Sequence, residues 1–131
     1  MILKHVIEPR FSEADPLGHI NNTALPVWFE HARNPFFQIF NPDLDVSKWN
    51  IILKKYDVEF VGQIYIGKNV EIRSRIEKIG NSSFTVIQEA WQSEKLVAKG
   101  NTVLVYFDYV NQKSEAIPES TREQLRQYLC E

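Results

Sequence analysis

Hydrophobic positions in the first third of the chain follow the period of a helix. Between residues 23 and 33 hydrophobic side chains recur every three or four positions, and the same spacing continues toward Ile39. Pro35 cannot lie inside a regular helix, because it lacks an N–H and its ring clashes with the preceding turn. We therefore predict a long helix with a break near Asn34 and a short second piece that ends at about Phe40.

The segments around this helix have the pattern of strands. Residues 2–11 favour a first strand, and residues 13–18 favour a turn in which Gly18 can adopt a positive φ. Turn-forming residues then separate four stretches rich in β-branched and aromatic residues, namely 51–66, 70–77, 84–91 and 96–109. A short helix is expected over 119–129. Because helices and strands do not alternate, the order predicts an α+β fold with an antiparallel sheet.

Length, composition and charge indicate one globular domain over residues 1–131. Hydrophobic residues make up 44% of the chain and charged residues 24%, which are ordinary globular proportions. The net charge of −2 predicts no bulk attraction to nucleic acid or to anionic lipid. No apolar run approaches the roughly 18 residues of a membrane span, and the first five residues are too short for a signal peptide, so we expect a cytoplasmic protein. The single cysteine, Cys130, excludes an intrachain disulfide and a Cys-rich zinc site.

The densest group of reactive residue types lies in residues 15–22, directly before the long helix. The Asp15 carboxylate would lie near the helix N-terminus, where free backbone N–H groups can hold a developing oxyanion. Such a carboxylate can take a proton from water or attack a substrate directly. Asp-Pro turns also occur for structural reasons, so two alternatives stay open: that Asp15 only stabilises the turn, and that His19 only caps or packs.

Residues 11–22, Phe-Ser-Glu-Ala-Asp-Pro-Leu-Gly-His-Ile-Asn-Asn, precede a helix that carries Phe-Glu-His-Ala-Arg at 29–33. This combination resembles the 4-hydroxybenzoyl-CoA thioesterase-like branch of the hotdog superfamily, and the likeness covers nearly the whole chain. It implies a hotdog fold, in which one antiparallel sheet wraps around a long helix, here with a short C-terminal helix. It also implies hydrolysis of an acyl-CoA or acyl-ACP thioester to acid and thiol. The resemblance further implies a homodimer or homotetramer and no metal or other cofactor.

The resemblance gives specific roles to residues of the loop. Asp15 matches the family's catalytic carboxylate, which acts as general base or as nucleophile. Asn22 falls where a backbone N–H at the helix start polarises the thioester carbonyl, and Gly18 lets the turn approach the substrate. His19 matches an active-site histidine of plant acyl-ACP thioesterases. Because Leu17 stands where those enzymes have asparagine, His19 is expected to be an accessory residue at best.

Further candidates lie outside this loop. Glu30 could act as a second acid or contact the substrate; the alternatives are that it pairs with Arg33 or is simply solvated. The resemblance implies contact with the CoA nucleotide for four residues in a predicted strand-turn-strand segment, Lys78, Asn81, Ser82 and Ser83. A tight hairpin with solvated charges would explain that segment equally well.

Other classes of function fit the sequence less well. There is no Gly-x-Ser-x-Gly motif of an α/β-hydrolase and no His-Glu-x-x-His spacing of a metal site. A non-catalytic protein that binds acyl groups or CoA is the main alternative. A hotdog dehydratase is a second one, although its His-Phe-Pro turn is absent. The sequence does not identify the acyl group.

Overall fold

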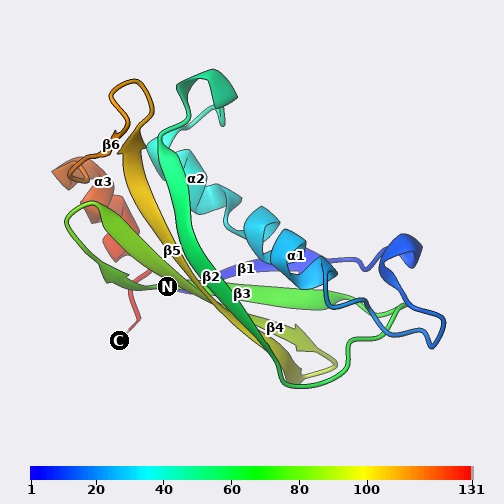
Figure 1. Ribbon diagram of the computed structural model, residues 1–131. Helices are drawn as coiled ribbons and strands as arrows, with labels where there is room; N and C mark the ends of the chain where they lie inside the picture. Colours follow the sequence, from blue (N-terminus) through cyan, green and yellow to red (C-terminus); the bar gives the residue numbers. More distant parts are fainter. Residues whose placement is uncertain (131) are drawn as a thin grey trace.

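The computed structural model describes residues 1–130, in which a curled antiparallel sheet wraps around helices on its concave side (Figure 1). The sheet contains β1 (Leu3–Ile7), β2 (Ile51–Phe60), β3 (Val70–Ile79), β4 (Ser83–Gln92), β5 (Lys95–Asp108) and β6 (Lys113–Ser114). Its order is β1-β3-β4-β5-β2, and β6 pairs with β5. The helices are α1 (Ala24–Ala32), α2 (Asn34–Phe40) and α3 (Glu119–Arg126), with short 3-10 turns η1 (Phe11–Glu13) and η2 (Val46–Lys48). This arrangement confirms the predicted α+β, hotdog-like fold.

The break predicted at Pro35 is confirmed. The helix α1 ends at Ala32, α2 begins at Asn34, and Pro35 lies in the first turn of α2. A missing N–H costs no helical hydrogen bond in a first turn. The predicted long helix is therefore present as two consecutive helices across the concave face of the sheet.

Two predicted strands are shorter than expected. The stretch 51–66 ends as a strand at Phe60, because the regular ladder stops where Val61 N–H and Gly62 N–H both donate to the Val97 carbonyl of β5. From Ile64 onward the chain pairs with the loop before α1. Ile20 N–H donates to the Ile64 carbonyl at 2.7 Å, and Ile66 N–H donates to the Gly18 carbonyl at 3.0 Å. The first strand ends at Ile7 instead of continuing to residue 11. Apolar and β-branched composition alone does not show whether a segment pairs with a strand of the sheet or with a loop.

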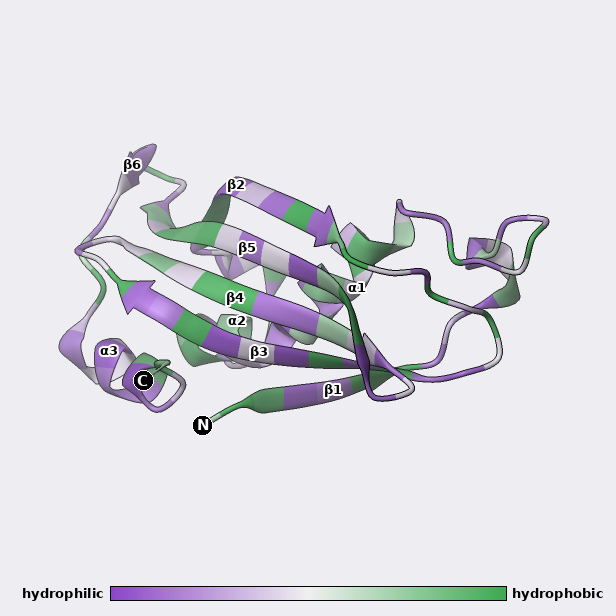
Figure 2. Ribbon diagram, turned by 90° about the horizontal axis from the view of Figure 1, so that it is seen from below, coloured by the Kyte–Doolittle hydropathy of each residue, from purple (hydrophilic) through white to green (hydrophobic). Residues whose placement is uncertain are grey.

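Alternation along the central strands separates the core from the outer face of the sheet. In β3, Val70, Ile72, Ser74 and Ile76 are buried, and the residues that alternate with them are charged and partly exposed. Figure 2 shows the resulting alternation of hydrophobic and hydrophilic bands on β3 and β4. The inward residues pack around α1 and α2 in two clusters. The helix packs tightly on the sheet at Gly100, where an added Cβ would lie 2.8 Å from the Phe29 ring.

The register of the strands defines two ends of the sheet. At one end Ser83 of β4, Val105 of β5 and Ile52 of β2 lie in one row, next to the turn between β3 and β4. At the other end Phe60 pairs with Ala98, and the chain continues into the loop that pairs with the segment before α1. The β3–β4 turn and that segment are therefore at opposite ends of the sheet, as Figure 1 shows.

Candidate active site

The loop before α1 folds back on itself as a small antiparallel hairpin. Asp15 N–H donates to the His19 carbonyl, and Asn21 N–H donates to the Glu13 carbonyl, both at 2.7 Å. Gly18 closes the hairpin with φ of +80°, the left-handed conformation that the sequence predicted for it. The open end of the hairpin leads directly into α1, so its chemistry lies beside the start of the helix.

The Asp15 carboxylate stabilises this turn with one of its oxygens. Oδ1 accepts hydrogen bonds from the backbone N–H groups of Leu17 at 2.9 Å and His19 at 3.0 Å. No hydrogen bond from residues 1–130 reaches the other oxygen, Oδ2, and the residue is half-buried. The structural role that the sequence left open is therefore present, and one carboxylate oxygen is left over for chemistry.

The start of α1 is ordered by Asn21. Its carbonyl accepts from Ala24 N–H at 3.0 Å, and its Oδ1 accepts from both Thr23 N–H and Thr23 Oγ1–H at 2.9 Å. Asn22 is exposed, and within residues 1–130 its backbone N–H has no acceptor. A free N–H at this position is what an incoming carbonyl oxygen would need.

The His19 ring packs against an aromatic neighbour. It lies edge-on to the Tyr65 ring, with centroids 5.0 Å apart and planes at 79°. Its backbone carbonyl and N–H close the hairpin around Asp15. The packing alternative for His19 is therefore observed, and any contact with water or substrate remains a prediction.

Glu13 anchors the loop to the helix, and the sequence analysis did not single it out. Its Oε2 accepts from Trp28 Nε1–H at 2.8 Å, and its Oε1 accepts from Arg10 N–H at 2.7 Å. Burial alone would raise the pKa of this carboxyl, but the hydrogen bonds from Arg10 and Trp28 hold its pKa below the ordinary value. Glu13 lies three positions after Arg10, the position of a capping-box acid, but arginine is not an N-cap residue type, so the sequence carries no signal for this role.

We expect Glu13→Gln to destabilise the protein by about 1–2 kcal/mol at pH 7, because a neutral amide accepts less strongly from these two donors. A carboxyl with a lowered folded-state pKa stabilises the fold above its unfolded pKa, and that stability is lost as the pH falls through the folded value. The difference between wild type and variant, measured by urea unfolding, should therefore shrink below pH 4. An equal difference at pH 7 and at low pH would contradict this account of Glu13.

Glu30 lies on α1 beside two cavities that follow the helices. The first has a volume of about 160 Å³ and lies between α1 and β2, and the second, of about 370 Å³, continues beside α2. Glu30 is exposed and, within residues 1–130, forms no ion pair with Arg33. The pairing alternative for Glu30 is therefore absent from the described structure. Asp15 lines neither cavity.

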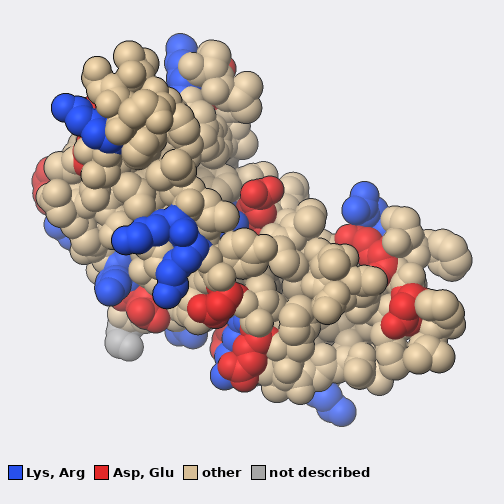
Figure 3. All heavy atoms as spheres, in the orientation of Figure 1, with Lys and Arg blue, Asp and Glu red and all other residues tan. Residues whose placement is uncertain are grey.

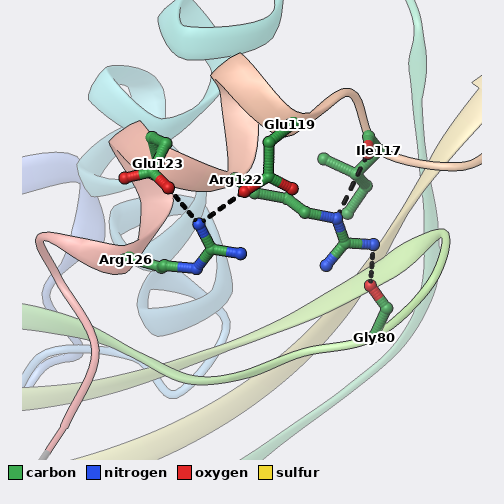
Figure 4. Close-up of polar contacts among 6 residues, drawn as sticks. All are labelled: Gly80, Ile117, Glu119, Arg122, Glu123 and Arg126. Atoms are coloured by element: carbon green, nitrogen blue, oxygen red, sulfur yellow. Dashed lines mark hydrogen bonds and ion pairs between the residues drawn. The ribbon is translucent and has the colours of Figure 1, made fainter.

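The candidate nucleotide-binding residues lie at the other end of the sheet. Arg122 of α3 donates from Nη2 to the Gly80 carbonyl at 2.7 Å and to the Asn81 carbonyl at 2.8 Å; Figure 4 shows the contact with Gly80. The Ser82 carbonyl accepts from Tyr106 N–H at 2.7 Å, so three carbonyls of this turn are held by the protein itself. The side chains of Lys78 and Asn81 are exposed, while Ser82 and Ser83 are partly exposed. Within one chain these residues are not brought together with Asp15.

The described chain was also compared with what a nucleic-acid surface, a metal site and a membrane span would require. The face in Figure 3 carries interspersed acidic and basic side chains rather than one extended basic surface. Over residues 1–130, no group of three or more His, Cys, Asp or Glu side chains is placed to hold a metal ion. No helix in the same range is long and apolar enough to cross a membrane.

Comparison with protein families and solved structures identifies relatives over most of the chain. Residues 9–125 match the model of the thioesterase-like superfamily. A predicted thioesterase from Bacillus stearothermophilus is 40% identical and superposes with a TM-score of 0.97, covering 100% of this chain and 98% of its own. A Thermus thermophilus thioesterase, solved with coenzyme A and Zn, is 28% identical with a TM-score of 0.83, covering 94% and 96%.

A further relative is the uncharacterized protein YsmA of Bacillus subtilis strain 168. It is 25% identical over 80 residues, which cover 61% of this chain. The match spans 54% of the length of that relative.

Proposed function

The chain belongs to the thioesterase-like superfamily, and from this membership we propose that it is an acyl-CoA thioesterase whose catalytic carboxylate is Asp15. The observation that carries the proposal is the free Oδ2 of Asp15 in a loop that leads directly to the free Asn22 N–H at the start of α1. Assignment to the 4-hydroxybenzoyl-CoA thioesterase-like branch is part of the proposal. It rests on the motif from Asp15 through Arg33.

The proposed reaction uses these groups in a defined order. The thioester carbonyl oxygen accepts from the Asn22 N–H at the helix start, which stabilises the oxyanion that forms. Oδ2 of Asp15 either takes a proton from an attacking water or attacks the carbonyl carbon itself, giving a mixed anhydride that water then hydrolyses. Both routes break the carbon–sulfur bond and release the acid and the CoA thiol. In this scheme Gly18 gives the substrate close access to the loop, and His19 orients water as an accessory.

A dimer would complete this site. The β2 strand is an edge of the sheet and carries the exposed apolar residues Leu53, Tyr56 and Phe60. If two β2 strands pair antiparallel about a twofold axis, the two sheets join and neither β2 edge remains unpaired. Because the β3–β4 turn lies at the opposite end of the sheet from Asp15, the same axis carries the partner's turn toward this Asp15.

The CoA nucleotide is proposed to bind where the two chains meet in this way. Lys78 would pair with phosphate, and Asn81, Ser82 and Ser83 would donate hydrogen bonds to it. The Thermus thermophilus relative, solved with coenzyme A, supports a CoA-type ligand. A homotetramer built from two such dimers is equally compatible with this site.

A thiol-release assay on a panel of acyl-CoA and acyl-ACP thioesters tests the proposed function. We expect stoichiometric release of free thiol and carboxylic acid from at least one member of the panel. A protein that only binds acyl groups or CoA would retain the ligands and release no thiol. A dehydratase would yield an enoyl thioester with the thioester bond intact. Either result would remove the thioesterase proposal.

A further inference from the structure

The two cavities beside the helices form one groove, here called the helix groove. The first is lined from Pro26, in the first turn of α1, to Arg33, just after its last turn, and β2 forms its opposite wall. The second begins at the same Glu30 and Arg33 and continues past Phe37 of α2. Most of the lining is apolar, and Leu53 of β2 lines both cavities. The groove therefore starts in the first turn of α1 and carries Glu30 and Arg33 where its two cavities meet. Asp57 of β2 also lines the first cavity.

Arg33 is a buried cation that the described chain satisfies only in part. Its exposed fraction is 5%, and its Nη1 donates to Gln88 Oε1 at 3.1 Å and to Thr102 Oγ1 at 3.2 Å. Its Nε has no acceptor but is fully enclosed, so a ligand cannot reach it. Its Nη2 also donates no hydrogen bond within residues 1–130 and is not fully enclosed, and no carboxylate in this range forms an ion pair with Arg33. Burial lowers the pKa of Arg33 to about 10, so it remains a cation at neutral pH. A buried charge left without its acceptors is costly, which indicates that a ligand group completes its hydrogen bonds.

Glu30 provides the opposite hydrogen-bonding character at the same place. It lies about one helical turn before Arg33 and lines both cavities, and its side chain makes no hydrogen bond within residues 1–130. Arg33 offers only donors and an ionised Glu30 offers only acceptors. A hydroxyl group can accept from Arg33 and donate to Glu30 at once. A carboxylate would be repelled by Glu30, and a methylene would leave Arg33 unsatisfied.

We propose that the helix groove binds the acyl chain and that Glu30 and Arg33 select a chain that carries a hydroxyl group. This inference rests on the proposed thioesterase function and deepens it by naming a substrate class. From Ala24 to Glu30 and Arg33 the helical rise amounts to roughly 9 to 14 Å. An extended medium-length chain such as decanoyl reaches this far from a thioester held at the helix start. The hydroxyl is therefore expected near the far end of a medium-length chain.

The test compares octanoyl, decanoyl and dodecanoyl CoA thioesters, each unsubstituted, ω-hydroxylated or ω-carboxylated. For wild type we expect kcat/KM to be about tenfold higher or more with the best ω-hydroxylated chain than with its unsubstituted counterpart, in line with a hydrogen bond to a charged group. The ω-carboxylated chain should be the poorest substrate of the three. Glu30→Gln should reduce the hydroxyl preference severalfold and should raise the relative rate on the ω-carboxylated chain, because the repelling charge is gone.

Glu30→Gln is the primary variant because Glu30 is exposed and its side chain makes no hydrogen bond to the described chain. Arg33→Gln, which keeps a donor toward Gln88 and Thr102, is the second, and it should also reduce the hydroxyl preference. Equal wild-type kcat/KM values for hydroxylated and unsubstituted chains would overturn the substrate class. If these chains are still hydrolysed, the thioesterase proposal survives that result. Equal loss of all three chain types in Glu30→Gln would instead assign Glu30 to the chemistry and overturn the selection role.

Discussion

Asp15→Asn is expected to lower kcat/KM for thioester hydrolysis by about 10³-fold or more, with the fold unchanged. The amide Oδ1 of asparagine can still accept from Leu17 N–H and His19 N–H, so the turn that Asp15 stabilises remains closed. What the variant loses is the charged Oδ2, which can neither take a proton from water nor attack a carbonyl once it is an amide nitrogen. Loss of a positioned base or nucleophile typically costs 10² to 10⁴ in rate. Thiol release and thermal unfolding measured on the same preparations separate chemistry from stability.

The matched control is Asp15→Ala, which removes both the chemistry and the two acceptor bonds of the turn. We expect it to be as inactive as Asp15→Asn and also less stable, by about 1–2 kcal/mol. If Asp15→Asn hydrolysed its best substrate at the wild-type rate, Asp15 would be left with its structural role alone. Unchanged affinity of Asp15→Asn for the product CoA would confirm that the binding site survives the substitution.

The parts of the fold that could be predicted from the sequence are those set by local physics. The break at Pro35 follows from a missing N–H and the turn at Gly18 from a positive φ. The buried face of β3 follows from its charged residues alternating with uncharged ones. The end of β2 at Phe60 could not be predicted in this way. Residues 61–66 have strand-like composition, but Val61 and Gly62 both donate to one carbonyl of β5, that of Val97. Residues 64 and 66 pair instead with Ile20 and Gly18, which lie more than forty positions earlier in the chain.

The candidate site likewise has features that could be predicted from the sequence and features that could not. The loop around Asp15 is a contiguous motif whose spacing is visible in the sequence. By contrast, Glu13 matters because of Trp28, and Arg33 because of two residues on β4 and β5, Gln88 and Thr102. Contacts between residues far apart in the chain carry no local signal. A helix arginine in a single sequence is most simply interpreted as a solvated charge, and only the fold shows it buried and incompletely satisfied.

Tyr56→Glu is expected to dissociate the proposed dimer, raising its dissociation constant by at least about a hundredfold. Tyr56 lies in the middle of β2 and is 52% exposed in the single chain. Antiparallel pairing of two β2 strands about a twofold axis places the two copies of this position close together. The variant would lose the apolar area of two aromatic rings and would place like charges opposite each other. Light scattering during size-exclusion chromatography over a dilution series measures the effect directly.

The other edge strand provides the control that makes this prediction specific. Val6 of β1 is 57% exposed, so Val6→Glu adds the same charge at a similarly exposed position on the opposite edge of the sheet. It should leave the dimer intact if the sheets join through β2, whose edge carries the exposed apolar residues Leu53, Tyr56 and Phe60. If Val6→Glu dissociated the dimer and Tyr56→Glu did not, the sheets would join through β1, and the proposed β2 interface would be wrong. The monomeric Tyr56→Glu variant should also bind CoA weakly, because in a single chain the Asp15 loop and the β3–β4 turn lie at opposite ends of the sheet.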